Sequence, residues 1–431
     1  MKIQRSEIYL FILVGLLVVS TNLGLVNRFV SIQSGSGENL IGLRDILVAM
    51  TVIYGLRVVR RPFALTNGIH LVIAGVLLMT PFSAIIGIMN GADLITVLRE
   101  SAVMASWAIP FFAARYLQHT GKYVVMGQVI IYVGLLTSIG VIIEGISGGR
   151  IALVTPAVSV LEMTKRSTPS GWPTMVMAAN VLIVLLFRDH TVSSFALKLR
   201  RFIFFSIIVI ASLLTQSRTL IISIIGPTAV FLTFSFFISP LRLRWNNIIV
   251  VIIFLSLVVF PIVLYFGNNW LKDDFSDYYK KRYSVLTSLD SANEDIEDGN
   301  ARVEELKVIF SDRVPESPLF GHGLSTIYRS YDSATLVHSI FGFFALRYGL
   351  IGLLLWSVFI VIVLRTMARA LLDHSITGIW GQAFSTAVFG IIVGATFGNV
   401  FATTYGVNQA MIGLSCLMAY IDSVSLKIKQ Q

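Results

Sequence analysis

The chain has 431 residues, of which 55% are hydrophobic and only 13% are charged, and its mean hydropathy is +0.81. Soluble domains carry roughly 25% charged residues, so the composition excludes an ordinary soluble protein and indicates a polytopic membrane protein. The formal net charge of +10 collects at membrane-flanking positions and is therefore no sign of a nucleic-acid partner. The single cysteine, Cys416, excludes an intramolecular disulfide and a cysteine-based metal site.

Twelve apolar windows have the length of membrane-spanning helices, so we expect an all-α bundle. The first window follows Lys2 and Arg5 and ends without a small-residue cleavage site, so we interpret it as a span and not as a signal peptide. The expected spans are residues 8–27, 40–56, 67–89, 93–114, 123–145, 171–187, 202–217, 219–238, 247–267, 338–364, 376–397 and 403–424.

Basic residues are concentrated in alternate connections between these spans. With the amino terminus in the cytoplasm, the inside segments contain Lys2, Arg5, Arg57, Arg60, Arg61, Arg115, Lys122, Arg188, Lys198, Arg200, Arg201, Arg242, Arg244, Arg365, Arg369, Lys427 and Lys429. The acidic residues of these segments are Glu7, Asp189, Asp373 and Asp422. The positive-inside rule therefore predicts that both termini are cytoplasmic.

A long hydrophilic stretch, residues 268–337, then falls outside the cytoplasm. It divides the chain into spans one to nine (1–267), a periplasmic loop (268–337) and spans ten to twelve (338–431). Within the loop, 273–289 and 300–310 have helix-like apolar spacing. A connection of this length is usually functional or disordered.

Arg218 is the single charge in the run from Phe202 to Ser239. About 38 residues reach nearly twice across the hydrocarbon core, which predicts two helices with almost no loop and Arg218 near one membrane face. An ionised guanidinium there is costly unless it is paired, hydrated or facing a polar cavity, so we interpret Arg218 as functional. The alternative is an arginine that snorkels from a tight turn.

Further cations lie on the face where the positive-inside rule disfavours them. Arg28 and Arg150 join Arg218 there, which indicates an anionic partner such as phosphate. Lys165 and Arg166 lie in the same outside segment, and for these two the favoured explanation is pairing with loop carboxylates.

After the acidic part of the loop, Arg302 begins an amphipathic helix. Pro315 and Pro318 are expected to end it, and Gly321 and Gly323 allow a sharp turn back to the membrane. His338 follows at the outer mouth of the tenth span. A neutral imidazole there can accept a proton from a hydroxyl as a general base. The alternative is an ordinary hydrogen-bonded interfacial histidine.

Adjacent charges also occur inside two other spans. Arg99 and Glu100 point about 100° apart on one helix, so each needs its own partner on another helix. We expect a structural ion pair for Glu100 and keep Arg99 as a phosphate-binding candidate. Arg44 and Asp45 follow the same argument, which makes Arg44 a further candidate.

Together these features resemble the O-antigen ligase and polymerase superfamily of bacterial envelope glycosyltransferases. The resemblance rests on about twelve spans with a large late loop and on an ordered set of residues: Ser217-Arg218 at the outer end of a mid-chain span, Arg302 leading to the P-x-x-G-x-G turn of Pro318, Gly321 and Gly323, and His338 ahead of Gly349 and Gly352. The chain departs from the pattern at Ser339, where Asn commonly follows the His, and at Arg347, where an acidic residue commonly precedes the Gly.

The resemblance implies a GT-C-like, metal-independent and inverting glycosyltransferase without a cofactor. Its donor would be a glycan on undecaprenyl diphosphate at the periplasmic face of the inner membrane, with Arg218 and Arg302 holding the diphosphate and His338 deprotonating the acceptor. The sequence agrees with a metal-independent reaction, because the carboxylate pair nearest the outer face, Asp273-Asp274, lies in a charged and solvated stretch. Two guanidiniums can stabilise a departing diphosphate without a metal.

Arg347 lies about two and a half helical turns beyond His338, roughly 13 Å deeper. It either lines a groove for the lipid carrier or pairs with Glu144.

Three functions fit this sequence. The histidine favours a ligase, which moves a completed glycan onto lipid A–core oligosaccharide, over a polymerase, which adds the chain to a glycan repeat unit. A transporter of lipid-linked glycan is a more distant alternative, which would need a polar pathway through the inner leaflet. No internal repeat and no nucleotide-binding motif supports transport.

Overall fold

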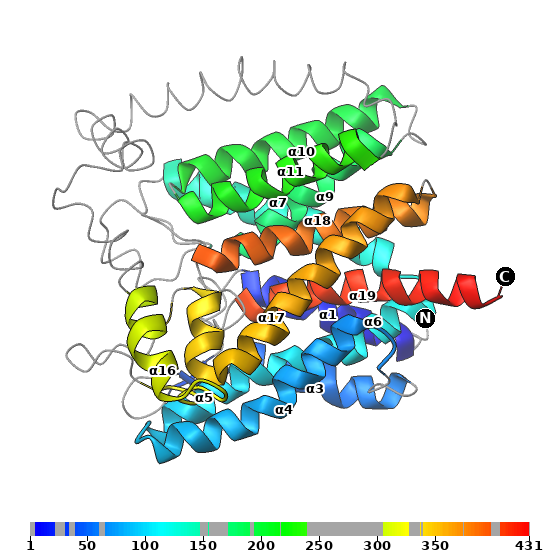
Figure 1. Cartoon of the computed structure of the whole chain (residues 1–431). Coiled ribbons are helices and arrows are strands. Elements are labelled where there is room, and N and C mark those ends of the chain that lie inside the picture. The colour runs from blue at the N-terminus through cyan, green and yellow to red at the C-terminus, as the bar shows by residue number, and fades with distance from the viewer. Residues whose placement is uncertain are drawn as a thin grey trace, which may run out of the picture.

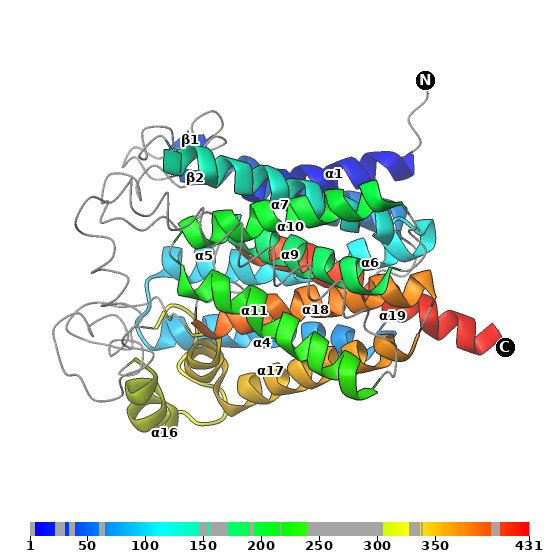
Figure 2. The same cartoon turned by 90° about the horizontal axis from the view of Figure 1, so that it is seen from above.

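The computed structural model describes residues 5–21, 31–33, 39–59, 65–146, 154, 171–189, 194–215, 217–238, 305–326, 337, 339–373, 375–397 and 406–430. Apart from one short pair of strands, the regular elements in these ranges are helices, and most of the long ones run side by side in one bundle (Figures 1 and 2). The expected α-helical class is therefore confirmed for the described part of the chain.

The elements before the large loop are α1 (Arg5–Thr21), β1 (Ser31–Gln33), β2 (Asn39–Gly42), α3 (Leu43–Val58), α4 (Gly68–Met89), α5 (Leu94–Ala105), the 3-10 turn η1 (Ser106–Ala108), α6 (Ile109–Thr120), α7 (Tyr123–Ile146), α9 (Trp172–Arg188), α10 (Phe195–Leu214) and α11 (Arg218–Ile238). Those after it are the π-helical turn η4 (Ile309–Arg313), α16 (Val314–Glu316), α17 (Ile340–Leu372), α18 (Ile376–Phe397) and α19 (Gly406–Gln430).

Several helices have the length and composition needed to cross a membrane. Five meet both criteria in the described residues: Gly68–Met89, Leu94–Thr120, Tyr123–Gly145, Ile340–Leu372 and Thr377–Thr396. Shorter apolar helices cover Glu7–Thr21, Trp172–Arg188 and Thr219–Ser235. The chain is thus an α-helical membrane protein. Helices occupy every expected span except 247–267, which lies outside the described residues, and the count of twelve spans stays a prediction.

The short strands precede the second expected span. β1 and β2 pair antiparallel, with Ser31 opposite Gly42 and Ile32 opposite Ile41. Because β2 runs directly into α3, the helix begins at Leu43, three residues later than the apolar window indicated. Apolar composition alone does not distinguish the end of a strand from the first turn of a helix.

The bundle has two distinguishable ends, which we name by what lies there. At the terminal end, α1 begins and α19 ends (Figure 1). Side chains join several helices there: Arg188 donates to the carbonyl of Leu371 at 3.1 Å, and Asp422 accepts from Asn67 at 2.9 Å and lies 4.0 Å from Arg115. At the opposite, loop end lies the segment 305–326 (Figure 1).

The apolar run around Arg218 forms two helices, as predicted. α10 ends at Leu214 and α11 begins at Arg218, and Ser217 donates its amide to the hydroxyl of Thr215 at 3.3 Å in the turn between them. α10 begins at Phe195, earlier than expected, because its first turns continue past the apolar window. The Arg201 side chain there pairs with Asp189 at 2.7 Å.

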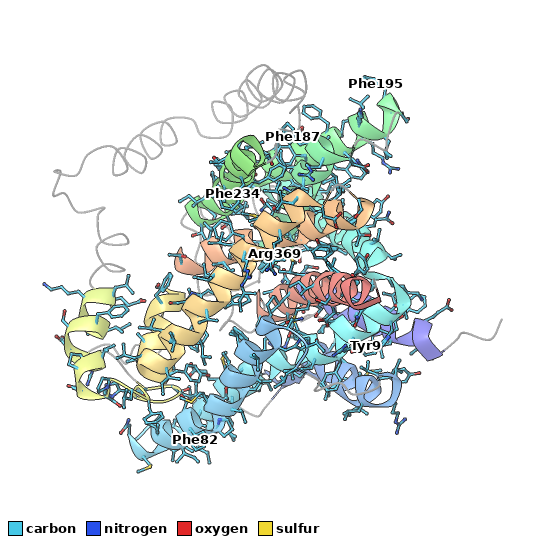
Figure 3. The ribbon with its side chains drawn as sticks, turned by 45° about the vertical axis from the view of Figure 1, so that its right-hand side comes forward. Tyr9, Phe82, Phe187, Phe195, Phe234 and Arg369 are labelled. Atoms are coloured by element: carbon cyan, nitrogen blue, oxygen red, sulfur yellow. The ribbon has the colours of Figure 1, made fainter. Side chains whose placement is uncertain are left out.

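Large aromatic residues fill the bundle core, and apolar stripes remain on its outside. Trp107 and Trp356 are completely buried. By contrast, α4 exposes Leu71, Leu78, Phe82, Ile85 and Met89. Figure 3 shows Phe82 at the outer edge of α4 and Phe195 at the periphery of α10. Such apolar outer faces suit contact with lipid and not with water.

Several buried polar side chains have atoms without a hydrogen-bond partner among the described residues. Gln382 and Thr386, one turn apart on α18, and Asn180 on α9 are completely buried. Within the described part of the chain, both side-chain amide atoms of Gln382, the hydroxyl of Thr386 and Oδ1 of Asn180 have no hydrogen-bond partner. Each such group lowers stability, because its hydration is lost without replacement.

Candidate functional site

The sequence-predicted site residues are described to different extents. Arg302, His338 and Arg150 lie outside the described residues. Arg218 opens α11, and its backbone alone is described. α10 starts beside Asp189 at the terminal end and runs the length of the bundle, so α11 starts at the loop end.

Glu305 brings the segment after Arg302 to the start of α17. Its side chain is 2% exposed, and Oε1 accepts a hydrogen bond from the backbone nitrogen of Ser339 at 3.4 Å. Ser339 is the N-cap residue of α17, and its hydroxyl is buried without a partner among the described residues. The carboxylate is therefore buried at a helix amino end, where unpaired amides and the helix dipole favour a negative charge.

Sequence reasoning missed Glu305, although a signal was present. Ile309 follows four residues later and is completely buried. Residues four apart share one face of a helix, so Glu305 stands on the apolar face of its amphipathic segment. A carboxylate on such a face needs a buried partner, and here one partner is a backbone amide.

The segment ends in the turn that the proline and glycine pattern predicted. Helical backbone ends at Glu316, and Gly321 and Gly323 both have positive φ, of 71° and 88°. Helical backbone runs without a break from residue 305 through η4 into α16, and it ends one residue after Pro315 and before Pro318, as expected from the two prolines. We call residues 317–326 the docked turn.

The docked turn uses hydrogen-bonding groups that a break in α17 leaves free. Gly349 has φ 64° and ψ −154°, which interrupts the helix. The carbonyl of Leu346 accepts from the amide of His322 at 2.7 Å, and the amide of Leu350 donates to the carbonyl of Pro318 at 2.8 Å. In an unbroken helix Leu346 and Leu350 would bond to each other. The turn and the break therefore stabilise each other.

The docked turn also packs closely against α4. The amide of Leu324 donates to the carbonyl of Ser83 at 2.9 Å. A Cβ atom on Gly87 would lie 2.2 Å from the carbonyl oxygen of Leu324, and one on Gly323 would lie 2.1 Å from the nitrogen of Gly87. Both glycines are needed because the two backbones approach too closely for any side chain.

Arg347 pairs with Glu100 and not with Glu144. Nε of Arg347 lies 3.1 Å from Oε1 of Glu100, while a carboxylate oxygen of Glu144 accepts from the amide of Val154. The expected structural ion pair of Glu100 is confirmed. Of the two alternatives for Arg347, the pair with Glu144 was wrong, because Arg347 on α17 faces Glu100 on α5. With a side chain 1% exposed, Arg347 lines no open groove.

The remaining candidates have simpler surroundings. Arg99 is exposed on α5. Asp93 caps that helix by accepting from the amide and hydroxyl of Thr96, both at 2.9 Å, and these bonds lower the pKa of Asp93. Arg44 pairs with its neighbour Asp45, which differs from the expectation of separate partners. In the first turn of α3 the long arginine side chain can fold back onto the adjacent carboxylate.

The described residues contain no group of three or more His, Cys, Asp or Glu side chains with the proximity of metal ligands. Asp273 and Asp274 lie outside them. Neither the known family models nor the curated proteins include a match to this sequence.

Proposed function

We propose that this protein is an O-antigen ligase-like, inverting and metal-independent glycosyltransferase. It transfers a glycan from undecaprenyl diphosphate to lipid A–core oligosaccharide at the periplasmic face of the bacterial inner membrane. The proposal starts from the resemblance carried by Arg218, Arg302 and His338.

One observed contact carries the proposal beyond the resemblance. Arg302 is three residues before Glu305 in the chain, and His338 directly precedes Ser339. Because Glu305 and Ser339 are hydrogen-bonded, the contact supports an arrangement in which a guanidinium and an imidazole share one site. α11, which Arg218 opens, also starts at the loop end of the bundle (Figure 1).

The proposed reaction needs no metal ion. The imidazole of His338 accepts the proton of the acceptor hydroxyl while the hydroxyl oxygen attacks the anomeric carbon. The bond from that carbon to the phosphate oxygen breaks, and the diphosphate leaves with the electron pair. Attack on the face opposite the leaving group inverts the anomeric centre. Arg218 and Arg302 stabilise the charge that develops on the diphosphate, since a guanidinium fork fits phosphate oxygens.

Charge at the terminal end supports the proposed orientation. The basic residues near that end in the described helices and turns include Arg57, Arg115, Lys122, Arg188, Lys198, Arg200, Arg201, Arg365 and Arg369. By the positive-inside rule this end faces the cytoplasm. The loop end, with the Glu305–Ser339 contact, then faces the periplasm.

Reconstitution with defined substrates tests the proposal. Purified protein is incubated with undecaprenyl-diphosphate glycan and either rough lipopolysaccharide or a lipid-linked repeat unit, in the presence of EDTA. We expect glycan to appear on lipopolysaccharide with an inverted anomeric linkage, and at the rate measured without EDTA. Transfer to the repeat unit alone would identify a polymerase.

Two further outcomes would contradict the proposal. Restoration of an EDTA-inactivated enzyme by magnesium or manganese would exclude the metal-free mechanism. Asp273 and Asp274 would then become candidate metal ligands. Movement of intact lipid-linked glycan across proteoliposomes, without transfer to either acceptor, would identify a transporter.

A further inference from the structure

Arg347 and Glu100 do more than neutralise each other. Nη1 of Arg347 donates to the carbonyl of Thr326 at 2.6 Å and to that of Gly323 at 3.4 Å, in addition to the Nε contact with Glu100. The other carboxylate oxygen of Glu100 accepts from the amide and the hydroxyl of Ser325, the latter at 2.7 Å. Both ionised groups therefore bind the backbone of the docked turn.

This bonding pattern depends on which residue is the donor. A buried ion pair that only balanced charge would need no backbone partners. Such a pair would also tolerate an exchange of its two charged residues. Here the guanidinium meets two carbonyl oxygens, which only a donor can satisfy, and the carboxylate meets an N–H, which only an acceptor can satisfy. Hydrogen bonds to ionised groups are stronger than neutral ones.

The docked turn is one of two attachments of the segment 305–326 to α17. At its beginning, Glu305 bonds to Ser339 at the helix amino end. At its end, the docked turn occupies the break at Gly349, and Arg347 and Glu100 hold its last residues. Two attachments to the same helix fix the segment in position and in rotation, whereas one would leave it free to pivot.

We infer that Arg347 and Glu100 are positioning residues, which hold the docked turn so that the segment 305–326, which follows Arg302 in the chain, keeps its place beside the start of α17. Neither side chain touches substrate in this role. The effect on catalysis rests on the proposed function, because it acts through Arg302 and His338. The contacts that hold the docked turn are independent of the proposed function.

A buried cysteine in the docked turn reports whether the turn is held. Leu324 is completely buried, so Leu324→Cys, in a Cys416→Ala background, should react slowly with a membrane-impermeant maleimide. Glu100→Gln keeps the shape and removes the charge, and Arg347→Met removes all donors. We expect each to raise the labelling rate about tenfold or more, the scale of one hydrogen bond to an ionised group.

A matched variant controls for the loss of any ion pair. Arg201→Met breaks the Arg201–Asp189 pair, whose side chains are 14% and 11% exposed and which lies at the terminal end. It should leave the labelling of the Leu324→Cys reporter unchanged. Unchanged labelling in folded, monodisperse Glu100→Gln would overturn the inference, and this milder variant decides the question even where Arg347→Met does not fold.

Exchange of the two charges separates positioning from simple pairing. In the double variant Glu100→Arg, Arg347→Glu, opposite charges still face each other, but a carboxylate meets the carbonyls of Gly323 and Thr326. We expect thermal stability to recover relative to Arg347→Glu alone, while the thiol of the Leu324→Cys reporter stays accessible. Recovery of protection in the double variant would show a plain ion pair and refute the positioning role.

Transfer kinetics then test the catalytic consequence. Glu100→Gln should lower kcat/KM for the lipid-linked donor and leave KM for the acceptor within about twofold, because the segment that moves follows Arg302, a proposed contact of the donor diphosphate. Arg347→Lys, which retains a charged donor, should recover part of the rate. Absence of transfer in the wild type would refute the proposed function alone, since the labelling result is obtained without any substrate.

Discussion

The carboxylate of Glu305 and the backbone nitrogen of Ser339 lie 3.4 Å apart, although 34 positions separate the two residues in the chain. The contact stands at the amino end of α17, where the first amides of a helix have no partner within it. It joins the end of the large loop to the helix that His338 precedes. This makes Glu305 the described residue whose substitution bears most directly on the proposed site.

Glu305→Gln should slow transfer without unfolding the protein. The amide retains the shape and an acceptor oxygen but removes the negative charge from the helix amino end. Charge–dipole interactions there are worth about 0.3–2 kcal/mol, which corresponds to a loss of about twofold to thirtyfold. Single-turnover transfer measures it. Glu316→Gln is the control, because that side chain is 55% exposed. Equal effects of the two substitutions would argue against a specific role for Glu305.

Arg218→Lys and Arg302→Lys should each lose most activity although the charge is retained. An ammonium group cannot reproduce two parallel hydrogen bonds to phosphate oxygens. The measurement is kcat/KM for the lipid-linked donor. A rate within about twofold of wild type, less than roughly 0.4 kcal/mol of transition-state stabilisation, would show that the arginine is structural and that the diphosphate binds elsewhere.

The proposed orientation predicts opposite accessibility of two cysteines. Ser291→Cys in the large loop should react with an impermeant maleimide added to intact cells, and Ser425→Cys near the end of α19 should not, until the membrane is opened. Cys416→Ala provides the background, because the native thiol is completely buried. Labelling of Ser425→Cys from outside would overturn the topology.

Much of the helical layout follows from apolar patterning alone. The turn between α10 and α11 falls where the length of the apolar run places it, beside Arg218. The docked turn was likewise predicted, because Gly321 and Gly323 supply the positive φ values that such a turn needs. These features are local, and local sequence is sufficient to predict them.

Partnerships between distant residues were harder to predict. The sequence shows that Arg347 and Glu100 are ionisable groups within apolar helices, so each needs a partner. From the sequence alone, Glu144 is an equally suitable partner for Arg347. The choice depends on the break at Gly349 and on the packing of Ser83 and Gly87 against the turn. A glycine within an apolar helix does not reveal whether the helix continues or breaks.

The buried amide of Gln382, which has no partner among the described residues, predicts a stabilising substitution. Gln382→Met replaces it with an apolar side chain of similar length, and removal of an unsatisfied buried polar group is worth about 1 kcal/mol or more. The melting temperature in detergent should rise, and transfer should be unchanged. Thr386→Val is a second variant of the same kind. Loss of activity in either would instead indicate that these side chains line a pathway, which favours the transporter.

His338→Ala should slow the chemical step and leave binding of the lipid-linked donor nearly intact. The reason is that a general base acts on the acceptor hydroxyl, whereas the proposed donor contacts come from Arg218 and Arg302. Removal of a general base typically costs about 10²- to 10⁴-fold. The wild-type rate should also fall as the pH is lowered, because a protonated imidazole cannot accept the hydroxyl proton.

The pH profile of the mutant distinguishes a base from a binding residue. In His338→Ala the residual rate should lack the acidic limb, while equilibrium binding of the donor is the parallel measurement. If donor binding disappears and the residual turnover keeps the wild-type pH dependence, His338 binds substrate and the proton leaves by another route. Ser339→Ala serves as the neighbouring control, since its buried hydroxyl has no partner to lose in the described part of the chain.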